Sequence, residues 1–261
     1  MRKEATMGNY YSEGFASFFD NSYTGWVNRF SPKLVAHLAT VPGTDRTAVD
    51  ICCGTGVTAA CFLDAGWTLH GVDGSKSMLD LARARHAGAI EAGRFSVVQS
   101  DARAFRLPAP VSACVSMDGA LNHLPSTEDL RACFSAAHAA LAPGGEFVFD
   151  LYEQTHFLHW NHVTLTDTDE AVVVKRGVWD TDTRTGMLRV SGVFGAGDRV
   201  QRVDQTLTSW YYDAEDVTTA LRAAGFEPLP HGFGGEDLKC DSGSCSRTAV
   251  PCRAIYRARK P

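Results

Sequence analysis

The feature that most constrains the fold is a glycine-rich turn between an apolar segment and a helical one. It reads Val49-Asp50-Ile51-Cys52-Cys53-Gly54-Thr55-Gly56-Val57-Thr58-Ala59. Glycines allow the backbone to turn tightly and to come close to a ligand, and open α/β sheets bind ligands outside the carboxyl ends of their strands. The turn therefore predicts a cofactor site on a parallel sheet.

Short apolar strands alternate with helices from residue 47 to residue 151, which is typical of a doubly wound parallel sheet. The expected strands are Ala48–Cys52, Leu69–Asp73, Ser96–Ser100, Ala113–Met117 and Glu146–Leu151. The expected helices are Val57–Ala65, Lys76–Arg85 and Glu128–Leu141, the last two capped by Ser75 and Ser126. Two further strands, Phe226–Phe233 and Ala254–Arg259, bring the α/β sheet to seven strands.

The segments outside this alternation have their own patterns. Aromatic residues at helical spacing near the N-terminus, from Tyr11 to Phe19, predict an amphipathic helix. A second helix is expected to begin with Ser31 as N-cap and Pro32 in the first turn. Segments 172–174, 187–194 and 199–212 predict antiparallel strands inserted before a helix that runs from Asp213 to Ala224. We expect one domain in four parts: 1–45, a helical lid; 46–152, the cofactor-binding core; 153–212, the insertion; and 213–261, a helix and the last two strands.

Carboxylates at the ends of the expected strands narrow the choice of cofactor. Asp73 ends the second strand, where it can accept hydrogen bonds from two ribose hydroxyls, and Asp101 ends the third, where it can accept one from an adenine amino group. A dinucleotide site would share the turn and Asp73. Asp50, however, favours a ligand with a cationic amino-acid end and disfavours a pyrophosphate.

These segments together resemble the class I S-adenosylmethionine-dependent methyltransferases, and most closely the bacterial small-molecule N-methyltransferases that act on amino sugars and other amines. The resemblance is carried by Asp50–Gly56, Gly71–Ser75 with Met78-Leu79, Gln99–Ala102 and Leu141–Gly145. It implies a Rossmann-like sheet, S-adenosyl-L-methionine as cofactor and an aromatic lid. It also implies that Gly54 and Gly56 underlie the methionine portion. The cofactor-binding residues implied in this way are Tyr10, Tyr23, Asp50, Cys52, Gly54, Gly56, Asp73, Gly74, Met78, Asp101, Ala102, Met117 and Asp118.

Two residues after the fourth expected strand are candidates for catalysis. Asp118 and His123 can orient an acceptor or take its proton, because the pKa of histidine, near 6.5, suits general-base work. Alternatively, Asp118 caps the turn and His123 packs near the methionine tail. The residues expected to contact the acceptor are aromatic, with plain packing as the alternative: Tyr11, Phe19, Tyr152, His156, Trp160 and Tyr211.

Composition excludes several other classes. A net charge of −5 provides no cationic field, so we expect no nucleic-acid or membrane partner. The sequence shows no leader and no spanning segment, which favours the cytoplasm. Of the eight cysteines, five are expected to be buried thiols, and the spacing of Cys240, Cys245 and Cys252 is unlike a zinc site, so no metal is expected.

The function that we expect is direct in-line methyl transfer from S-adenosylmethionine to a small molecule. The acceptor atom is expected to be a nitrogen, or an oxygen, of a natural product, an amino sugar or an amino-acid or peptide amine. An NAD(P)-dependent oxidoreductase is the first alternative, since the turn and Asp73 suit it too. A protein that binds S-adenosylmethionine without catalysis is the second.

Overall fold

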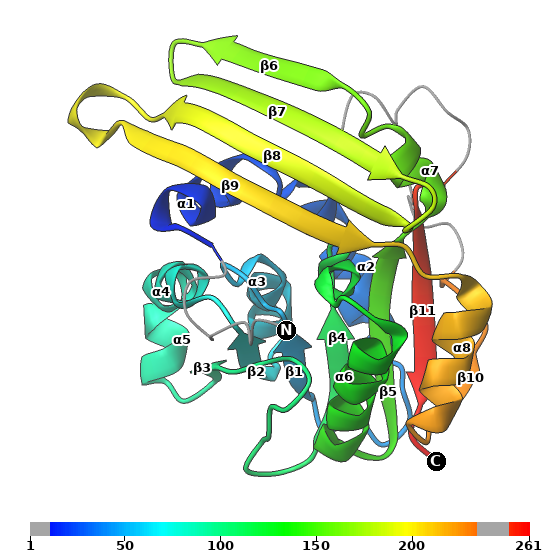
Figure 1. Cartoon of the computed structure of the whole chain (residues 1–261). Helices are drawn as coiled ribbons and strands as arrows, with labels where there is room; N and C mark the ends of the chain where they lie inside the picture. The colour runs from blue at the N-terminus through cyan, green and yellow to red at the C-terminus, as the bar shows by residue number, and fades with distance from the viewer. Residues whose placement is uncertain (1–10, 234–250) are drawn as a thin grey trace.

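The computed structural model describes residues 11–233 and 251–261, and its centre is the predicted seven-stranded sheet. The strand order is β10-β11-β5-β4-β1-β2-β3, with β11 antiparallel to β5 and β10 antiparallel to β11 (Figure 1). The strands are β1 (Thr47–Ile51), β2 (Thr68–Asp73), β3 (Phe95–Gln99), β4 (Val111–Ser116), β5 (Leu141–Tyr152), β10 (Glu227–Leu229) and β11 (Arg253–Arg259). The Rossmann-like arrangement expected from the strand and helix pattern is confirmed.

Helices cover both faces of this sheet, as the alternating pattern predicts. On one face, α2 (Gly25–Leu38) and α3 (Val57–Asp64) bury aromatic and aliphatic side chains against β1 and its neighbours. On the other, α6 (Thr127–Ala140) and α8 (Ala214–Ala223) pack against β4, β5 and β11. The helices α4 (Lys76–Arg85) and α5 (Ala87–Glu91) lie beside β2 and β3.

The N-terminal helices correct one prediction. Helix α1 (Glu13–Ser22) forms as expected, but α2 begins at Gly25, so Ser31 and Pro32 lie inside it and do not start a helix. Pro32 lies on the exposed side, where water can satisfy the carbonyl that its missing N–H leaves without a partner. The hydroxyl of buried Ser31 donates to the Val27 carbonyl at 2.7 Å. The continuous buried stripe from Trp26 to Leu38 outweighs the local start signal.

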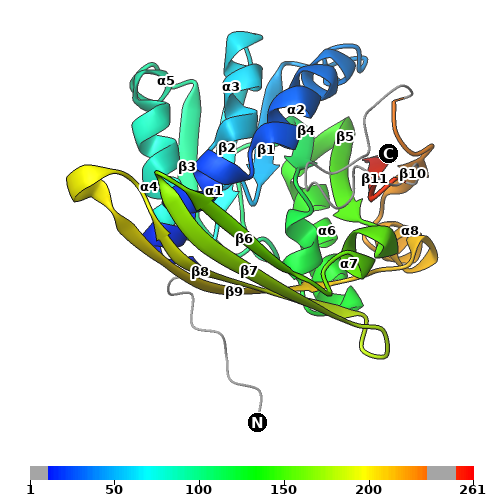
Figure 2. The ribbon, with the colours of Figure 1, turned by 90° about the horizontal axis from the view of Figure 1, so that it is seen from above.

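The insertion forms a second, four-stranded antiparallel sheet that lies across the carboxyl ends of the first sheet (Figures 1 and 2). Its strands are β6 (Val163–Thr168), β7 (Ala171–Asp180), β8 (Thr185–Phe194) and β9 (Gln201–Trp210). Three of them agree with the prediction, whereas β6 was not predicted because its alternating residues are nearly all exposed. Two short helices adjoin the sheet: α7 (Gln154–Leu158) precedes it and η2 (Gly197–Arg199) lies in its last turn.

The remaining expectations differ in detail. The strand expected over 226–233 is shorter, since only Glu227–Leu229 pairs with β11. Cys53, Cys114 and Cys133 are buried, as expected, whereas Cys52 and Cys61 are partly accessible; none of the five is in a disulfide. Cys240 and Cys245 lie outside the described residues. Over residues 11–233 and 251–261, no helix combines the length and apolar character needed to cross a membrane.

Candidate functional site

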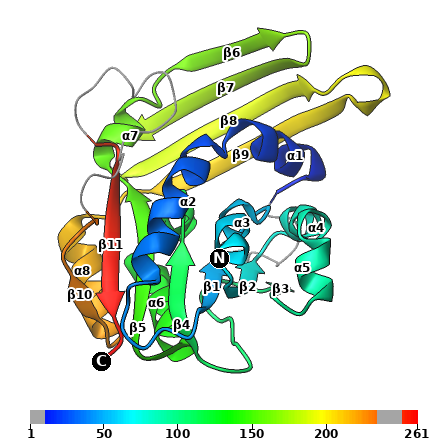
Figure 3. The same cartoon turned by 180° about the vertical axis from the view of Figure 1, so that it is seen from behind.

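A cavity of about 790 Å³ lies at the carboxyl ends of β1, β2, β3 and β4, below α1. Figure 3 shows α1 between the two sheets, directly above this edge. Many of the predicted site residues line the cavity: Tyr11, Phe19, Asp50, Cys52, Gly54, Asp73, Gly74, Met78, Asp101, Ala102, Met117, Asp118 and His123. The structure therefore brings the predicted cofactor and catalytic residues together from segments far apart in the sequence.

The glycine-rich turn is fixed by its backbone geometry. Gly54 and Gly56 have φ of 54° and 76°, in the left-handed region that side chains disfavour. A Cβ on Gly56 would lie 3.0 Å from the ring of His86, whose Nε2 is 2.7 Å from the Gly56 carbonyl. Gly56 itself serves as the N-cap of α3 and does not line the cavity.

Two residues without the freedom of glycine are also left-handed at this edge. Cys52 follows β1 with φ of 60°, and Asp118 follows β4 with φ of 70°. Both line the cavity. Strained backbone of this kind persists where the surrounding structure holds it, and it gathers at functional sites.

Asp73 is held by the backbone of two neighbouring turns. Its carboxylate accepts hydrogen bonds from the Gly54 amide at 2.9 Å and the Ser75 amide at 2.8 Å. Burial raises the pKa of Asp73, and these two hydrogen bonds oppose the rise. The carboxylate retains lone pairs on the cavity side, which suits acceptance from hydroxyl groups of a ligand.

Asp50 has unsatisfied hydrogen-bonding capacity. Its side chain is 2% exposed, and its Oδ2 has no hydrogen-bond partner in the described residues. Burial raises its pKa well above the ordinary value, and the nearby Asp73 carboxylate raises it further. A buried carboxylate oxygen without a partner costs free energy that a cationic ligand group would recover.

At the other end of the cavity, Asp101 belongs to a compact ion-pair group. Arg103 donates to both oxygens of Asp101 and also to Asp129 at 2.5 Å. The hydrogen bond from Arg103 lowers the pKa of Asp101, although burial opposes this. Asp101 therefore enters the cavity wall as a carboxylate.

Asp118 is paired with an arginine that sequence reasoning missed. Arg253, on β11, donates to Asp118 at 2.7 Å and to the fully buried Asp150 at 2.8 Å. Asp150 also accepts from the Gly119 amide at 3.0 Å, which holds the turn after β4. In the sequence, the signal for this pairing was that Arg253 directly precedes a predicted buried strand. A guanidinium that is buried there requires carboxylate partners.

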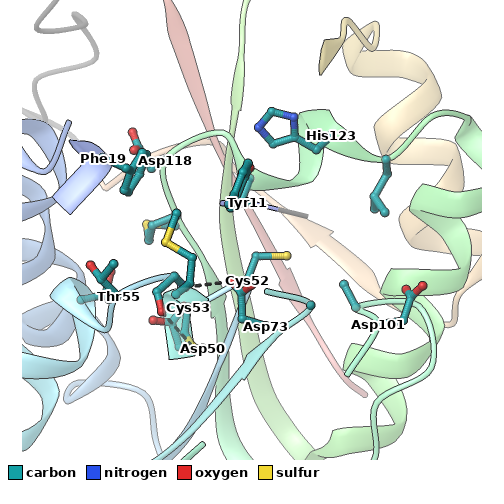
Figure 4. A pocket seen from close by; sticks show the side chains of 18 of the residues that line it. Tyr11, Phe19, Asp50, Cys52, Cys53, Thr55, Asp73, Asp101, Asp118 and His123 are labelled. Atoms are coloured by element: carbon teal, nitrogen blue, oxygen red, sulfur yellow. Dashed lines mark hydrogen bonds between the residues drawn. The ribbon is translucent and has the colours of Figure 1, made fainter. Parts of the chain in front are cut away.

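His123 lies in the short helix η1 (Ala120–His123) and is held in one tautomer. Its Nδ1 donates to the Thr208 carbonyl at 2.7 Å, so Nε2 carries the lone pair of the neutral ring. Burial lowers the pKa of His123, although the bond to Thr208 opposes this. In Figure 4, His123 and Asp118 lie on the upper side of the cavity, opposite Asp50, Asp73 and Asp101.

Helix α1, which belongs to the predicted lid, contributes Phe19 to the cavity wall and is tied to the sheet edge. Asp20 accepts two hydrogen bonds from Arg85 at 2.7 Å each, and Thr55 donates to the same carboxylate at 2.5 Å. This latch of Asp20, Arg85 and Thr55 joins α1 to the glycine-rich turn. Tyr23 lies outside the cavity wall, and its buried hydroxyl has no hydrogen-bond partner within residues 11–233 and 251–261. Tyr10 lies outside the described residues.

Four of the predicted acceptor contacts are not in the cavity wall: Tyr152, His156, Trp160 and Tyr211. Tyr152 stacks on His156 with ring centroids 3.7 Å apart, and its ring covers Gly119. Trp160 packs against Gly186 of β8. Burial raises the pKa of Tyr211 to about 12, with Glu153 and Asp213 adding to the rise. These aromatics pack α7 and the second sheet together; a role in acceptor binding stays a prediction.

The donor set fits the expected cofactor. A cationic amino-acid end suits Asp50, ribose hydroxyls suit Asp73, and the wall that holds Asp101 and Ala102 is open to an adenine ring. Among the described residues, no group of three or more histidine, cysteine or acidic side chains could hold a metal ion.

Comparison with known proteins agrees with this fit. Residues 48–145 match the family described as methyltransferase domain. Over 102 residues, 39% of this chain and 40% of the relative, the chain is 34% identical to the dTDP-3-amino-3,4,6-trideoxy-alpha-D-glucopyranose N,N-dimethyltransferase of Streptomyces venezuelae.

Two solved structures share the fold over nearly the whole chain. An S-adenosylmethionine-dependent methyltransferase from Clostridium acetobutylicum ATCC 824 has a TM-score of 0.74 at 18% identity, covering 94% of this chain and 97% of its own. The sugar N-methyltransferase KedS8 from Streptoalloteichus sp ATCC 53650 has a TM-score of 0.72 at 20% identity, covering 100% and 98%. These two structures show the shared fold, and the methyltransferase domain match with the Streptomyces venezuelae relative favours the methyltransferase over the oxidoreductase alternative.

Proposed function

We propose that this chain is a class I S-adenosylmethionine-dependent methyltransferase that methylates an amine nitrogen of a small molecule, with amino sugars as the favoured acceptors. The observation that carries the proposal is the charge of the cavity wall. Five carboxylates line it, and Arg103 is the one lysine or arginine among the described lining residues. The lining carboxylates are Asp50, Asp73, Asp101, Asp118 and Asp129. A wall of this kind attracts cationic amines and disfavours anionic groups inside the cavity, so the amine end of the acceptor, and not a phosphate, enters it.

The two sides of the cavity have different roles: one binds the cofactor and the other positions the acceptor. S-adenosylmethionine supplies, when bound, a methyl carbon that its sulfonium makes electrophilic. Asp50 binds the ammonium of the methionine portion, and Asp73 accepts hydrogen bonds from the ribose. Asp101 and Ala102 meet the adenine. The glycine-rich turn lets the backbone approach the methionine portion without side chains in the way.

The opposite side positions the acceptor. Asp118 accepts an N–H hydrogen bond from the amine and so directs its lone pair into the cavity. His123, neutral because burial lowers its pKa, takes the proton that the nitrogen releases, at Nε2. Tyr11 and Phe19 on the lid exclude water. Because orientation alone can remove about 7–11 kcal/mol of barrier, we expect His123 to assist the reaction rather than to be indispensable.

The architecture assigns a part to each segment of the chain. We propose that residues 1–45 form the lid, 46–152 hold the cofactor, 153–212 roof the cavity and 213–261 complete the sheet as one domain. The second sheet lies across the carboxyl ends of the first, which supports a compact acceptor and not a folded protein or a duplex (Figure 2). The relative from Streptomyces venezuelae, which by its name acts on a nucleotide-linked amino sugar, directs the choice of first acceptors.

The test follows transfer of a deuterated methyl group from S-adenosylmethionine by mass spectrometry. Three matched acceptors are compared: a nucleotide-linked amino sugar, its N-acetyl derivative and the sugar with hydroxyl in place of the amine. We expect label only on the free amine. His123→Asn is expected to lower kcat about tenfold to a hundredfold without changing cofactor affinity. Labelling of the hydroxyl sugar but not of the amine would refute nitrogen as the acceptor atom. Cofactor binding without transfer to any acceptor would favour the non-catalytic alternative.

A further inference from the structure

The carboxylates of the cavity wall differ in whether a cation balances them. Arg103 pairs with Asp101 and Asp129. Arg253 pairs with Asp118. Asp50 and Asp73 have no cationic partner among the described residues: Asp73 accepts only backbone amides, and one oxygen of Asp50 accepts nothing. The carboxyl groups without a cationic partner therefore lie where the methionine portion belongs, whereas Asp118, on the side that faces the acceptor, has one.

Arg253 is buried and contacts residues of α2 and of the neighbouring strand β5. Its side chain is only 4% exposed, and it does not line the cavity itself. Its guanidinium lies 4.1 Å from the ring centroid of Trp26 and 4.5 Å from that of Tyr152, and it donates to the Tyr152 hydroxyl at 3.3 Å. These contacts join α2, β5 and β11 behind Asp118. A buried arginine held in this way has a fixed position and a permanent charge.

We propose that Arg253 is a positioning residue that balances the charge of Asp118, so that Asp118 orients an acceptor amine without holding it in the protonated form. The inference rests on the proposed amine methylation. An ammonium has no lone pair and cannot attack a methyl carbon, yet an unbalanced carboxylate in a water-poor cavity stabilises it strongly. With Arg253 at 2.7 Å, Asp118 remains a hydrogen-bond acceptor, and the guanidinium, which also pairs with Asp150, offsets part of its charge.

The other titratable groups around Asp118 cannot replace this arginine. Asp150 on β5 is a second carboxylate, and it shares Arg253. Burial raises the pKa of Tyr23, and the Asp118 carboxylate raises it further, so the phenol stays neutral. His123 is neutral because burial lowers its pKa. Arg253 is thus the cation that forms an ion pair with Asp118.

A binding ratio tests the proposal without turnover. Sinefungin carries a protonated amine where S-adenosylmethionine carries its methyl sulfonium, whereas S-adenosylhomocysteine is neutral there. The ratio of their Kd values, measured by calorimetry at one pH, reports the field at the reacting centre. We expect Arg253→Gln to raise the preference for sinefungin about tenfold, because removing a charge partner shifts such equilibria by about one pH unit or more. We expect Arg253→Lys to restore the ratio of the original protein.

Asp118→Asn tests the same charge balance by removing the carboxylate instead of the arginine. It also keeps the proposal testable if Arg253→Gln fails to fold. It leaves the charge of Arg253 in place, so the preference for sinefungin should fall about tenfold. If Arg253→Gln no longer binds S-adenosylhomocysteine, the ratio of the two Kd values in Asp118→Asn tests the proposal in its place. In Asp118→Asn combined with Arg253→Gln, the ratio should return toward that of the original protein. Ratios that stay constant in variants that bind S-adenosylhomocysteine normally would overturn the proposal, whatever the acceptor proves to be.

Amine kinetics give a second readout. In Arg253→Gln, the cationic acceptor should bind more tightly, so KM falls, while kcat falls because less of the amine is neutral. The acid limb of the kcat profile should move up by about one pH unit. A residue with a purely structural role would lower activity at every pH without moving the profile. Absence of amine methylation in the original protein would refute the proposed function but leave the binding ratio as a valid test of Arg253.

Discussion

Replacement of Gly56 by alanine tests how the glycine-rich turn supports the cofactor site. At φ of 76°, a side chain costs about 1–2 kcal/mol. The new Cβ would also lie 3.0 Å from Cδ2 of the His86 ring and 3.3 Å from the Ala82 Cβ. His86 is buried and bonded to the Gly56 carbonyl, so its displacement weakens that hydrogen bond, at a further cost of about 0.5–1.5 kcal/mol. We expect Gly56→Ala to destabilise the fold by about 1.5–3.5 kcal/mol.

Gly43→Ala is the matched control. Gly43 has nearly the same φ, 78°, but no atom lies within 4 Å of the added Cβ. It should therefore show only the backbone cost of about 1–2 kcal/mol. Urea denaturation measures stability, and calorimetry measures affinity for S-adenosylmethionine, which should fall about tenfold in Gly56→Ala and not in Gly43→Ala. Equal effects of both variants on stability and affinity would refute the role assigned to the contact with His86.

Three further predictions concern charge and the lid. Burial raises the pKa of Asp50, and the nearby Asp73 raises it further, so binding of S-adenosylmethionine should release a proton from Asp50. The affinity should therefore weaken as pH falls. Calorimetry in two buffers of different ionisation enthalpy counts the released protons, and Asp50→Asn should abolish the release. Burial raises the pKa of Glu146, but the hydrogen bonds and charges of His37 and Arg257 together outweigh it and leave the pKa lowered. This stabilisation is therefore present above the ordinary pKa and is lost as pH falls through the lowered value. Glu146→Gln should therefore destabilise the protein near pH 7 but not in acid, in denaturation at both pH values. Arg85→Ala should raise KM for the acceptor severalfold, because the latch to Asp20 opens, whereas unchanged KM and kcat would show that the latch does not matter.

The parts of the fold and site that the sequence predicts are those with local signals. The turn from Asp50 to Gly56 and the carboxylates at the ends of β2 and β3 are set by their position after apolar strands. Because parallel strands all end at one edge of the sheet, such residues meet without further information.

The errors arise where distant contacts decide. Pro32 enters the interior of α2 because the buried stripe of the whole helix outweighs one start signal. Tyr152 and Trp160 have the composition of a binding wall, but their rings contact Gly119 and Gly186 and do not line the cavity; their role in acceptor binding stays a prediction. The pairing of Arg253 with Asp118 joins residues 135 positions apart, and no local pattern indicates such a pair.

The most direct test of the cofactor site is a titration of S-adenosylmethionine into the original protein and into Asp73→Asn, with exposed Asp64→Asn as control. Asp73 accepts two backbone amides at the cavity, so an amide nitrogen in its place would face one of these donors and remove the charge that binds the ribose. We predict tight binding in the original protein and in Asp64→Asn, and a loss of at least about tenfold in Asp73→Asn. Undiminished binding in Asp73→Asn, or tight binding of NAD(P)H in place of S-adenosylmethionine, would contradict the account.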